Sequence, residues 1–201
     1  MNDDCIGVNP GHGANGYEWN SVQWSSDGSE VYAADGDSSS PSFYTIPVNS
    51  DGFGSVTAYS LPFIAFPSNP QLYFSIHYEP VSGYVFSDSG QVLNTADGSV
   101  VATLNHSGAV IPDGNLGAVF VLWWNNQSNG YELDSFDIQS RTLIASQILP
   151  GLIGSPVKLI RWGSDGLALL TLVSAAPKAT PQGAIYILEG PFIGNPKSAA
   201  N

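Results

Sequence analysis

The 201-residue sequence has few basic residues. Its five lysines and arginines all follow position 140, so the first 140 residues carry acidic charge only, and the formal net charge is -12. A phosphate backbone or an anionic membrane surface requires a face rich in Lys and Arg. We therefore exclude nucleic acid and anionic membranes as partners.

Cysteine and long apolar runs are also scarce. The single cysteine, Cys5, excludes an intrachain disulfide and a cysteine-based metal or redox pair. No run approaches the roughly 20 apolar residues that cross a bilayer. The acidic start of the chain differs from the basic start of a signal peptide. We expect no membrane insertion and no signal peptide in this chain.

Glycine and proline, by contrast, are frequent. The 22 Gly and 14 Pro residues interrupt the apolar runs at short intervals, which is the spacing of strands and turns rather than of helices. A chain of this length buries roughly 70% of its surface on folding, so it needs no covalent staples. The composition predicts a single all-β domain over residues 1–201.

One segment of the sequence recurs. Residues 22–28 (VQWSSDG) and 160–166 (IRWGSDG) each indicate a strand, an Asp-Gly turn and a second apolar strand. Their tryptophans, Trp24 and Trp162, are 138 residues apart. This distance divides into three repeats, each within the roughly 40 to 50 residues of one propeller blade. Weaker copies surround the turns at Asn69 and Asp113.

The repeat predicts a β-propeller of about four blades, each with four antiparallel strands. The alternative is a β-sandwich, which requires no such period. The last blade has only three expected strands, so its sheet is incomplete. Residues 17–19 would complete it, or the chain would form an open arc, part of a larger propeller, that self-associates through its free edges. The expected units span approximately residues 18–61, 62–105, 106–150 and 151–193, with a tail at 194–201.

Four segments resemble a known group of proteins. Residues 158–168 and 184–191, together with 83–92 and 110–113, are similar to the C-terminal part of certain exported bacterial propeller repeat proteins, some of which carry immunoglobulin-like domains. The resemblance implies an extracytoplasmic scaffold or binding module, secreted, periplasmic or on the cell surface. It implies no catalytic residue.

A pair of tryptophans ends one apolar run. Trp123 and Trp124 must point to opposite faces of a strand, so only one of them can enter the core between blades. An exposed Trp beside Asn125 would stack on sugar rings while the amide bonds hydroxyl groups. Ordinary blade packing is the alternative interpretation.

Two further residues complete the candidate ligand-binding set of Trp123, Trp124, Asn125, Arg161 and His77. Arg161, one of two arginines, adjoins Trp162 and is expected to pair with an acid near the axis or to stack on a ring. The histidines have no metal-binding spacing, but a propeller can bring His77 to the axis. We predict no catalytic residue and no metal site.

Acidic residues cluster at expected turns. In each Asp-Gly pair the Asp is expected to bond the local backbone and the Gly to adopt positive φ. Residues 35–37 and 49–52 bring oxygen ligands together, but neither has the full pattern of a calcium loop. We therefore expect turns and no cofactor, with calcium as the only ion considered. The Asp-Gly pairs begin at Asp27, Asp97, Asp113 and Asp165.

The sequence thus leads to one functional hypothesis and two alternatives. The leading hypothesis is a non-enzymatic propeller scaffold or binding module for a protein or a cell-surface polysaccharide. The first alternative is a propeller enzyme, a lactonase-like hydrolase or a polysaccharide lyase, with His77 or His106 and carboxylates gathered at the axis. The second is a truncated fragment without an independent function.

Overall fold

The computed structural model describes residues 21–35, 41–62, 75–173 and 182–199. Within these residues the chain forms four antiparallel sheets, one after another along the sequence, followed by two short helices. Neither helix has the length or the hydropathy needed to cross a bilayer. Residues 17–19, the turn at Asn69, Cys5, His12 and Asp37, which the sequence singled out, lie outside the described residues.

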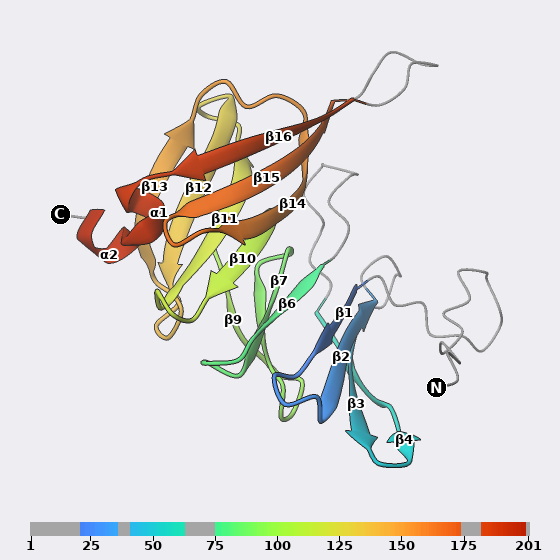
Figure 1. Cartoon of the computed structure of the whole chain (residues 1–201). Coiled ribbons are helices and arrows are strands. Elements are labelled where there is room, and N and C mark those ends of the chain that lie inside the picture. The colour runs from blue at the N-terminus through green and yellow to red at the C-terminus, as the bar shows by residue number, and fades with distance from the viewer. Residues whose placement is uncertain (1–20, 36–40, 63–74, 174–181, 200–201) are drawn as a thin grey trace.

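Each sheet is one blade of a β-propeller (Figure 1), which confirms the predicted architecture in place of the β-sandwich. Blades 1 and 2 contain nine strands. In blade 1, β5 pairs with β3 beside the short β4, and in blade 2 the strands pair in sequence order. The strands of blade 1 are β1 (Ser21–Trp24), β2 (Glu30–Asp35), β3 (Ser42–Asn49), β4 (Gly52–Phe53) and β5 (Thr57–Ser60); those of blade 2 are β6 (Ile76–Glu79), β7 (Tyr84–Ser87), β8 (Gln91–Asn94) and β9 (Val100–Thr103).

Blade 3 has four strands in sequence order, and blade 4 has three, as the sequence predicted for the last unit. After blade 4 the chain turns into two helices, where the sequence had indicated only a polar tail. The elements are β10 (Ala109–Asp113), β11 (Ala118–Asn125), β12 (Gly130–Asp137) and β13 (Leu143–Leu149) in blade 3, β14 (Ser155–Trp162), β15 (Gly166–Val173) and β16 (Gln182–Glu189) in blade 4, and then α1 (Pro191–Gly194) and α2 (Pro196–Ala199).

The Asp-Gly turns follow the predicted chemistry only in part. The Asp27 carboxylate accepts hydrogen bonds from the Ser29 N–H and hydroxyl, which lower the pKa of Asp27 to about 2, and Gly28 has a φ of 71°. Asp97 and Gly98 repeat this arrangement. In the turns after β10 and β14 the positive φ falls instead on Gly117 and Gly163. A Gly after Asp was therefore a correct signal for the turns, and for positive φ at Gly28 and Gly98 but not at Gly114 and Gly166.

The core lies between neighbouring blades, because side chains alternate between the two faces of each sheet. On β11, Val119 and Val121 pack towards blade 2, whereas Phe120 and Leu122 pack towards blade 4. A separate cluster that includes Phe43 joins blades 1 and 2. All four of these β11 side chains are completely buried. The blades are thus held together by three apolar layers.

Candidate ligand-binding site at the propeller axis

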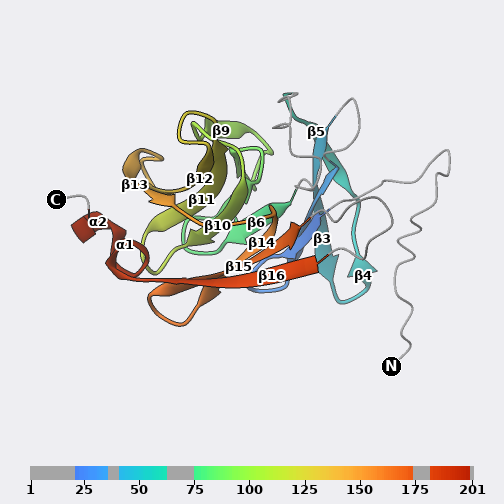
Figure 2. The same ribbon diagram turned by 90° about the horizontal axis from the view of Figure 1, so that it is seen from above.

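The first strands of the four blades surround the propeller axis. Strand β6 contacts both β1 and β10, and β10 contacts β14. Figure 2 shows β6, β10 and β14 near the middle of the molecule, with β9 and β13 towards its outside. The first residues of β1, β6 and β10 line one cavity together with residues 157–160 of β14. The ends of β6, β10 and β14 line another, so these three inner strands run in the same direction. We call these two spaces the start-side cavity and the end-side cleft.

The end-side cleft has a volume of about 620 Å³. Three segments line it: the end of β6 with its turn (residues 78–81), the end of β10 with its turn (residues 112–116), and the end of β14 (Arg161, Gly163 and Ser164). The polar groups of this cleft therefore come from blades 2, 3 and 4, at the point where each inner strand leaves the axis.

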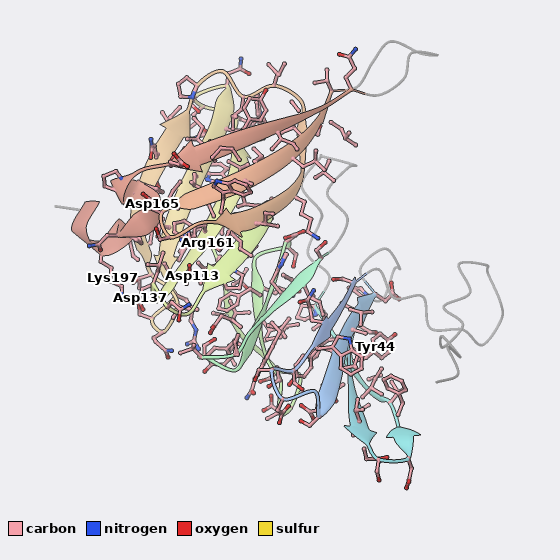
Figure 3. All side chains as sticks on the ribbon, viewed as in Figure 1. Tyr44, Asp113, Asp137, Arg161, Asp165 and Lys197 are labelled. Carbon is pink, nitrogen blue, oxygen red and sulfur yellow. The ribbon has the colours of Figure 1, made fainter. Side chains whose placement is uncertain are left out.

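Arg161 joins two of these blades. Its Nε lies 2.8 Å from Oδ2 of Asp113, its Nη2 donates to the carbonyl of Ser164 over 2.7 Å, and its guanidinium lies over the Phe120 ring, 5.9 Å from the centroid. Figure 3 shows Arg161 and Asp113 next to each other at the boundary of blades 3 and 4. The expectation that Arg161 pairs with an acid or lies over a ring is met on both counts.

The wall of the cleft on the side of blade 2 is rigid. The buried Glu79 carboxylate accepts hydrogen bonds from the N–H groups of Val81, at 2.9 Å, and Ser82, at 2.6 Å. Gly114 passes so close that a Cβ placed on it would lie 2.1 Å from Oε1 of Glu79. Asn115, by contrast, is exposed. Its side-chain amide lines the cleft and has no hydrogen-bond partner among the described residues.

Exposed aromatic rings lie on the end side. Trp24 and Trp162 are the last residues of β1 and β14, and they are 54% and 52% exposed. Phe53 lies 6.1 Å from Trp24 between ring centroids. The two tryptophans occupy equivalent places in the repeated sequence, so the repeat itself was the signal that could have identified them as surface residues. The candidate set from the sequence did not include them.

The start-side cavity, of about 450 Å³, contains His77. Its Nε2 lies 3.1 Å from Oδ1 of Asp88, which also accepts a hydrogen bond from the Val110 N–H over 3.1 Å. Lys158 lines the same cavity from β14. His77 therefore does reach the axis, but the contacts of its partner Asp88 tie blade 2 to blade 3.

The two tryptophans at the end of β11 have different surroundings. Trp123 stacks on His106 with 3.5 Å between ring centroids. His106 Nδ1 is 2.6 Å from Oδ2 of Asp134, a completely buried carboxylate whose Oδ1 accepts a hydrogen bond from the Ser146 hydroxyl. Trp123 thus belongs to a polar network between blades 2 and 3 rather than to an open surface.

Trp124 is 44% exposed and packs edge-on against Tyr131. The amide of Asn125 is already engaged, because its Nδ2 donates to Glu132 and its Oδ1 accepts from the Gln127 N–H. Trp124 and Asn125 lie at the start side of the axis. They follow Leu122 on β11, and Leu122 is already opposite Ala109, the first residue of β10. The structure thus distributes the five candidate residues over three places and does not bring them together.

Potential metal ligands do not cluster in the part of the chain that the structure describes. No group of three or more His, Cys, Asp or Glu side chains converges there. Residues 49–52, considered as calcium ligands, form a turn in which the Asp51 N–H donates to Oδ1 of Asn49 and Gly52 has a φ of 110°. At the axis, the described histidine and carboxylate that meet are His77 and Asp88.

Comparison with known proteins supports the fold and nothing finer. No protein-family model matches the chain, and no curated protein matches it. Hydrazine synthase from Kuenenia stuttgartiensis is similar over 84% of this chain and 50% of that one, with a TM-score of 0.56 and 14% sequence identity. The β-propeller domain of the trilobed protease from Pyrococcus furiosus, described as having an open velcro topology, matches 86% of this chain and 55% of that one, with a TM-score of 0.40 and 10% identity.

This chain spans about half the length of both solved structures. At such low identity the first likeness concerns the fold alone, and the second is too distant to add to it. The propeller part of the family resemblance is confirmed by the four sheets. Membership of the exported bacterial group stays a prediction. The chain is a β-propeller protein.

Proposed function

We propose that the protein is a non-enzymatic binding module that holds a neutral polysaccharide at the end-side cleft. The observation that carries this proposal is the cleft of about 620 Å³, where polar side chains from three blades converge at the end of the axis that also displays Trp24 and Trp162. A concave site with a few convergent polar groups is the usual form of a ligand pocket.

The chemistry of the cleft suits hydroxyl groups. The amide of Asn115 offers both donors and an acceptor. Asp113 and Arg161 bond each other and nearby backbone groups, so they contribute a polar lining whose hydrogen bonds are already made. A sugar ring also has an apolar face, which packs on an aromatic ring such as the exposed indole of Trp162. A chain of sugar units extending from the cleft past the end of β14 would thus find polar groups inside the cleft and the Trp162 indole on the other face of blade 4.

Charge favours a neutral ligand over an acidic one. The protein carries a formal net charge of -12, which repels polyanions. Within the cleft the Arg161 guanidinium already pairs with Asp113, and the Glu79 carboxylate is bonded to backbone N–H groups. No unpaired positive group remains among the described residues of the cleft to bind a carboxylate or sulfate.

The other hypotheses remain as alternatives to this proposal. A protein ligand would use the same face, and an extracytoplasmic location goes with either ligand because the resembling proteins are exported. A hydrolase or lyase would require His77 and Asp88 to face a substrate at the start side, where the two groups bond each other. A fragment without its own function would melt without cooperativity.

Titration calorimetry and thermal melts test the proposal. Neutral soluble xylan, galactomannan and dextran fragments are the probes, and polygalacturonate is the anionic comparison. A bound glycan at about 100 times its dissociation constant should add about 2.7 kcal/mol of stability and raise the melting midpoint. We expect Trp162→Ala and Asn115→Ala each to weaken binding about tenfold, which corresponds to about 1.4 kcal/mol.

Matched controls lie at the opposite end of the axis. Trp124 has an exposed indole, as Trp162 has, and Asn126 is exposed, as Asn115 is. Trp124→Ala and Asn126→Ala should leave binding unchanged. Loss of binding in these two variants would move the site to the start side. A cooperative melt that no neutral glycan shifts would reject the polysaccharide and leave a protein ligand.

A further inference from the structure

The outer edge of blade 4 differs from the edges of the other blades. Strand β16 pairs with β15 along one side, and no other described residue pairs with it. Beyond Glu189 the chain turns into α1 and does not add a fourth strand. This eight-residue strand therefore presents a row of N–H and C=O groups that no strand of the described residues pairs, which is a template for pairing with another strand.

The other outer edges have features that discourage such pairing. The outer strands β5 and β9 have only four residues each, and α2 packs beside β13. Strand β16 has none of these features: it contains no Pro and no Lys, and its one charged residue, Glu189, is its last. Ile185 is 73% exposed on it, and Ile187 is 45% exposed. Natural proteins rarely leave such an edge free.

We propose that β16 pairs antiparallel with β16 of a second copy of this chain, about a two-fold axis through Tyr186. Both copies present the same edge, so a two-fold axis brings each N–H of one β16 strand opposite a C=O of the other. The end-side cleft is lined by the ends of β6, β10 and β14 and by no residue of β16, so this pairing would leave the cleft open. The proposal is independent of the proposed function.

The register follows from the side chains. Centred on Tyr186, it places Ile185 opposite the partner's Ile187 and Ala184 opposite the partner's Leu188, so that apolar residues face each other across the junction. Glu189 then lies opposite the partner's Gly183, and no two like charges face each other. The alternation of faces is preserved, because residues of equal parity are opposite one another.

The pairing would also join two apolar surfaces. On the face of blade 4 turned away from blade 3, Ile160, Ala168 and Ile187 are in register across β14, β15 and β16, as are Lys158, Leu170 and Ile185. Two copies would make one sheet of six strands in which these rows continue from one copy into the other. The exposed Ile185 would gain an apolar neighbour on its open side.

Sedimentation equilibrium of the full chain tests the proposal. Wild type should show a concentration-dependent dimer, and Ile187→Glu should weaken it at least tenfold by placing a charge at the junction. Combining Ile185→Lys with Ile187→Glu should restore the dimer, because opposite charges then face each other in the proposed register. Ile160→Glu, on the same face but on inner strand β14, is the control and should leave the dimer intact.

Each other outcome counts against the proposal. A wild-type chain that is monomeric at all concentrations overturns it. Equal dissociation by Ile160→Glu and Ile187→Glu would indicate packing of two faces instead of two edges. The proposed register would be wrong if the double variant of Ile185→Lys and Ile187→Glu did not restore the dimer although its thermal melt resembled that of Ile187→Glu.

Discussion

Blades 3 and 4 are neighbours of similar strand length, yet they are buried to very different extents. Blade 3 packs on both faces, through Val121 towards blade 2 and Leu122 towards blade 4. Among the described residues, blade 4 packs on one face only, that turned to blade 3. Its other face exposes Ile160, Trp162, Leu170, Ile185 and Ile187. Because the strands of both blades are similarly apolar, the neighbours of a blade rather than its own composition decide how much of it is buried.

The polar contacts of blades 3 and 4 show the same difference as their burial. In blade 3, the buried Asp134 links His106 to Ser146, which fixes the linker from blade 2 against β12 and β13. In blade 4, Arg161 on β14 forms an ion pair with Asp113 on β10 and so links blade 4 to blade 3. It lies on the face that blade 4 turns to blade 3. The described polar ties and the apolar core of blade 4 are therefore both on one side of its sheet.

Two adjacent leucines on β15 give the sharpest test of this comparison. Leu169 is completely buried against blade 3, whereas Leu170 is 36% exposed on the open face. Leu169→Ala should lower the free energy of unfolding by about 2 to 5 kcal/mol, since it removes buried atoms and leaves a cavity. Leu170→Ala should cost less than about 1 kcal/mol. Urea unfolding measures both, and equal losses would mean that the open face is covered in solution.

The polar network of blade 3 should produce the next largest effect. Asp134→Asn keeps the shape of the side chain but replaces an acceptor of two hydrogen bonds by a group that also donates. We expect a loss of about 2 kcal/mol, because the hydrogen bonds of His106 and Ser146 are both made to a completely buried carboxyl group. Asp51→Asn, in an exposed turn, is the control and should change stability by less than about 0.5 kcal/mol. Unfolding in urea again provides the measurement.

Much of this fold could be predicted from the sequence because the propeller is a repeat. The recurrence of a strand, a tryptophan and an Asp-Gly turn at residues 22–28 and 160–166 predicted a propeller of about four blades, and the structure has four sheets. The helices after β16 were not predicted. The docking of Ile193 into the core between blades 3 and 4 depends on a tertiary contact that the local sequence does not contain.

The candidate site was harder to predict for a physical reason. The Trp123 and Trp124 pair looked like a surface feature, but the ring of Trp123 is held by His106, which comes from the linker before β10. Asp113 was correctly taken as a turn residue, yet its second oxygen binds Arg161 from the next blade. Contacts across blades decide which polar groups remain free, and a single sequence does not show them.

The smallest expected effect concerns the C-terminal helix. Lys197 Nζ lies 2.7 Å from Oδ2 of Asp137, at the turn that ends β12 (Figure 3). The Lys197 hydrogen bond, with the Ser140 N–H, lowers the pKa of Asp137 from 3.8 to about 2. A lowered pKa stabilises the fold above the unfolded pKa, so this contribution is present above about pH 4 and is lost as the pH falls through about 2.

Lys197→Met should therefore reduce stability by less than about 1 kcal/mol at pH 6, because the ammonium is half exposed. The difference from wild type should shrink as the pH falls from 4 to 2, where Asp137 becomes protonated in both proteins. Thermal melts across this range measure it, and carboxyl NMR should show the pKa of Asp137 rising in the variant. Lys158→Met removes an exposed lysine that has no ion pair among the described residues, so it should leave that pKa unchanged. A difference that stays constant down to pH 2 would mean that α2 is held to blade 3 by packing and not by this charge.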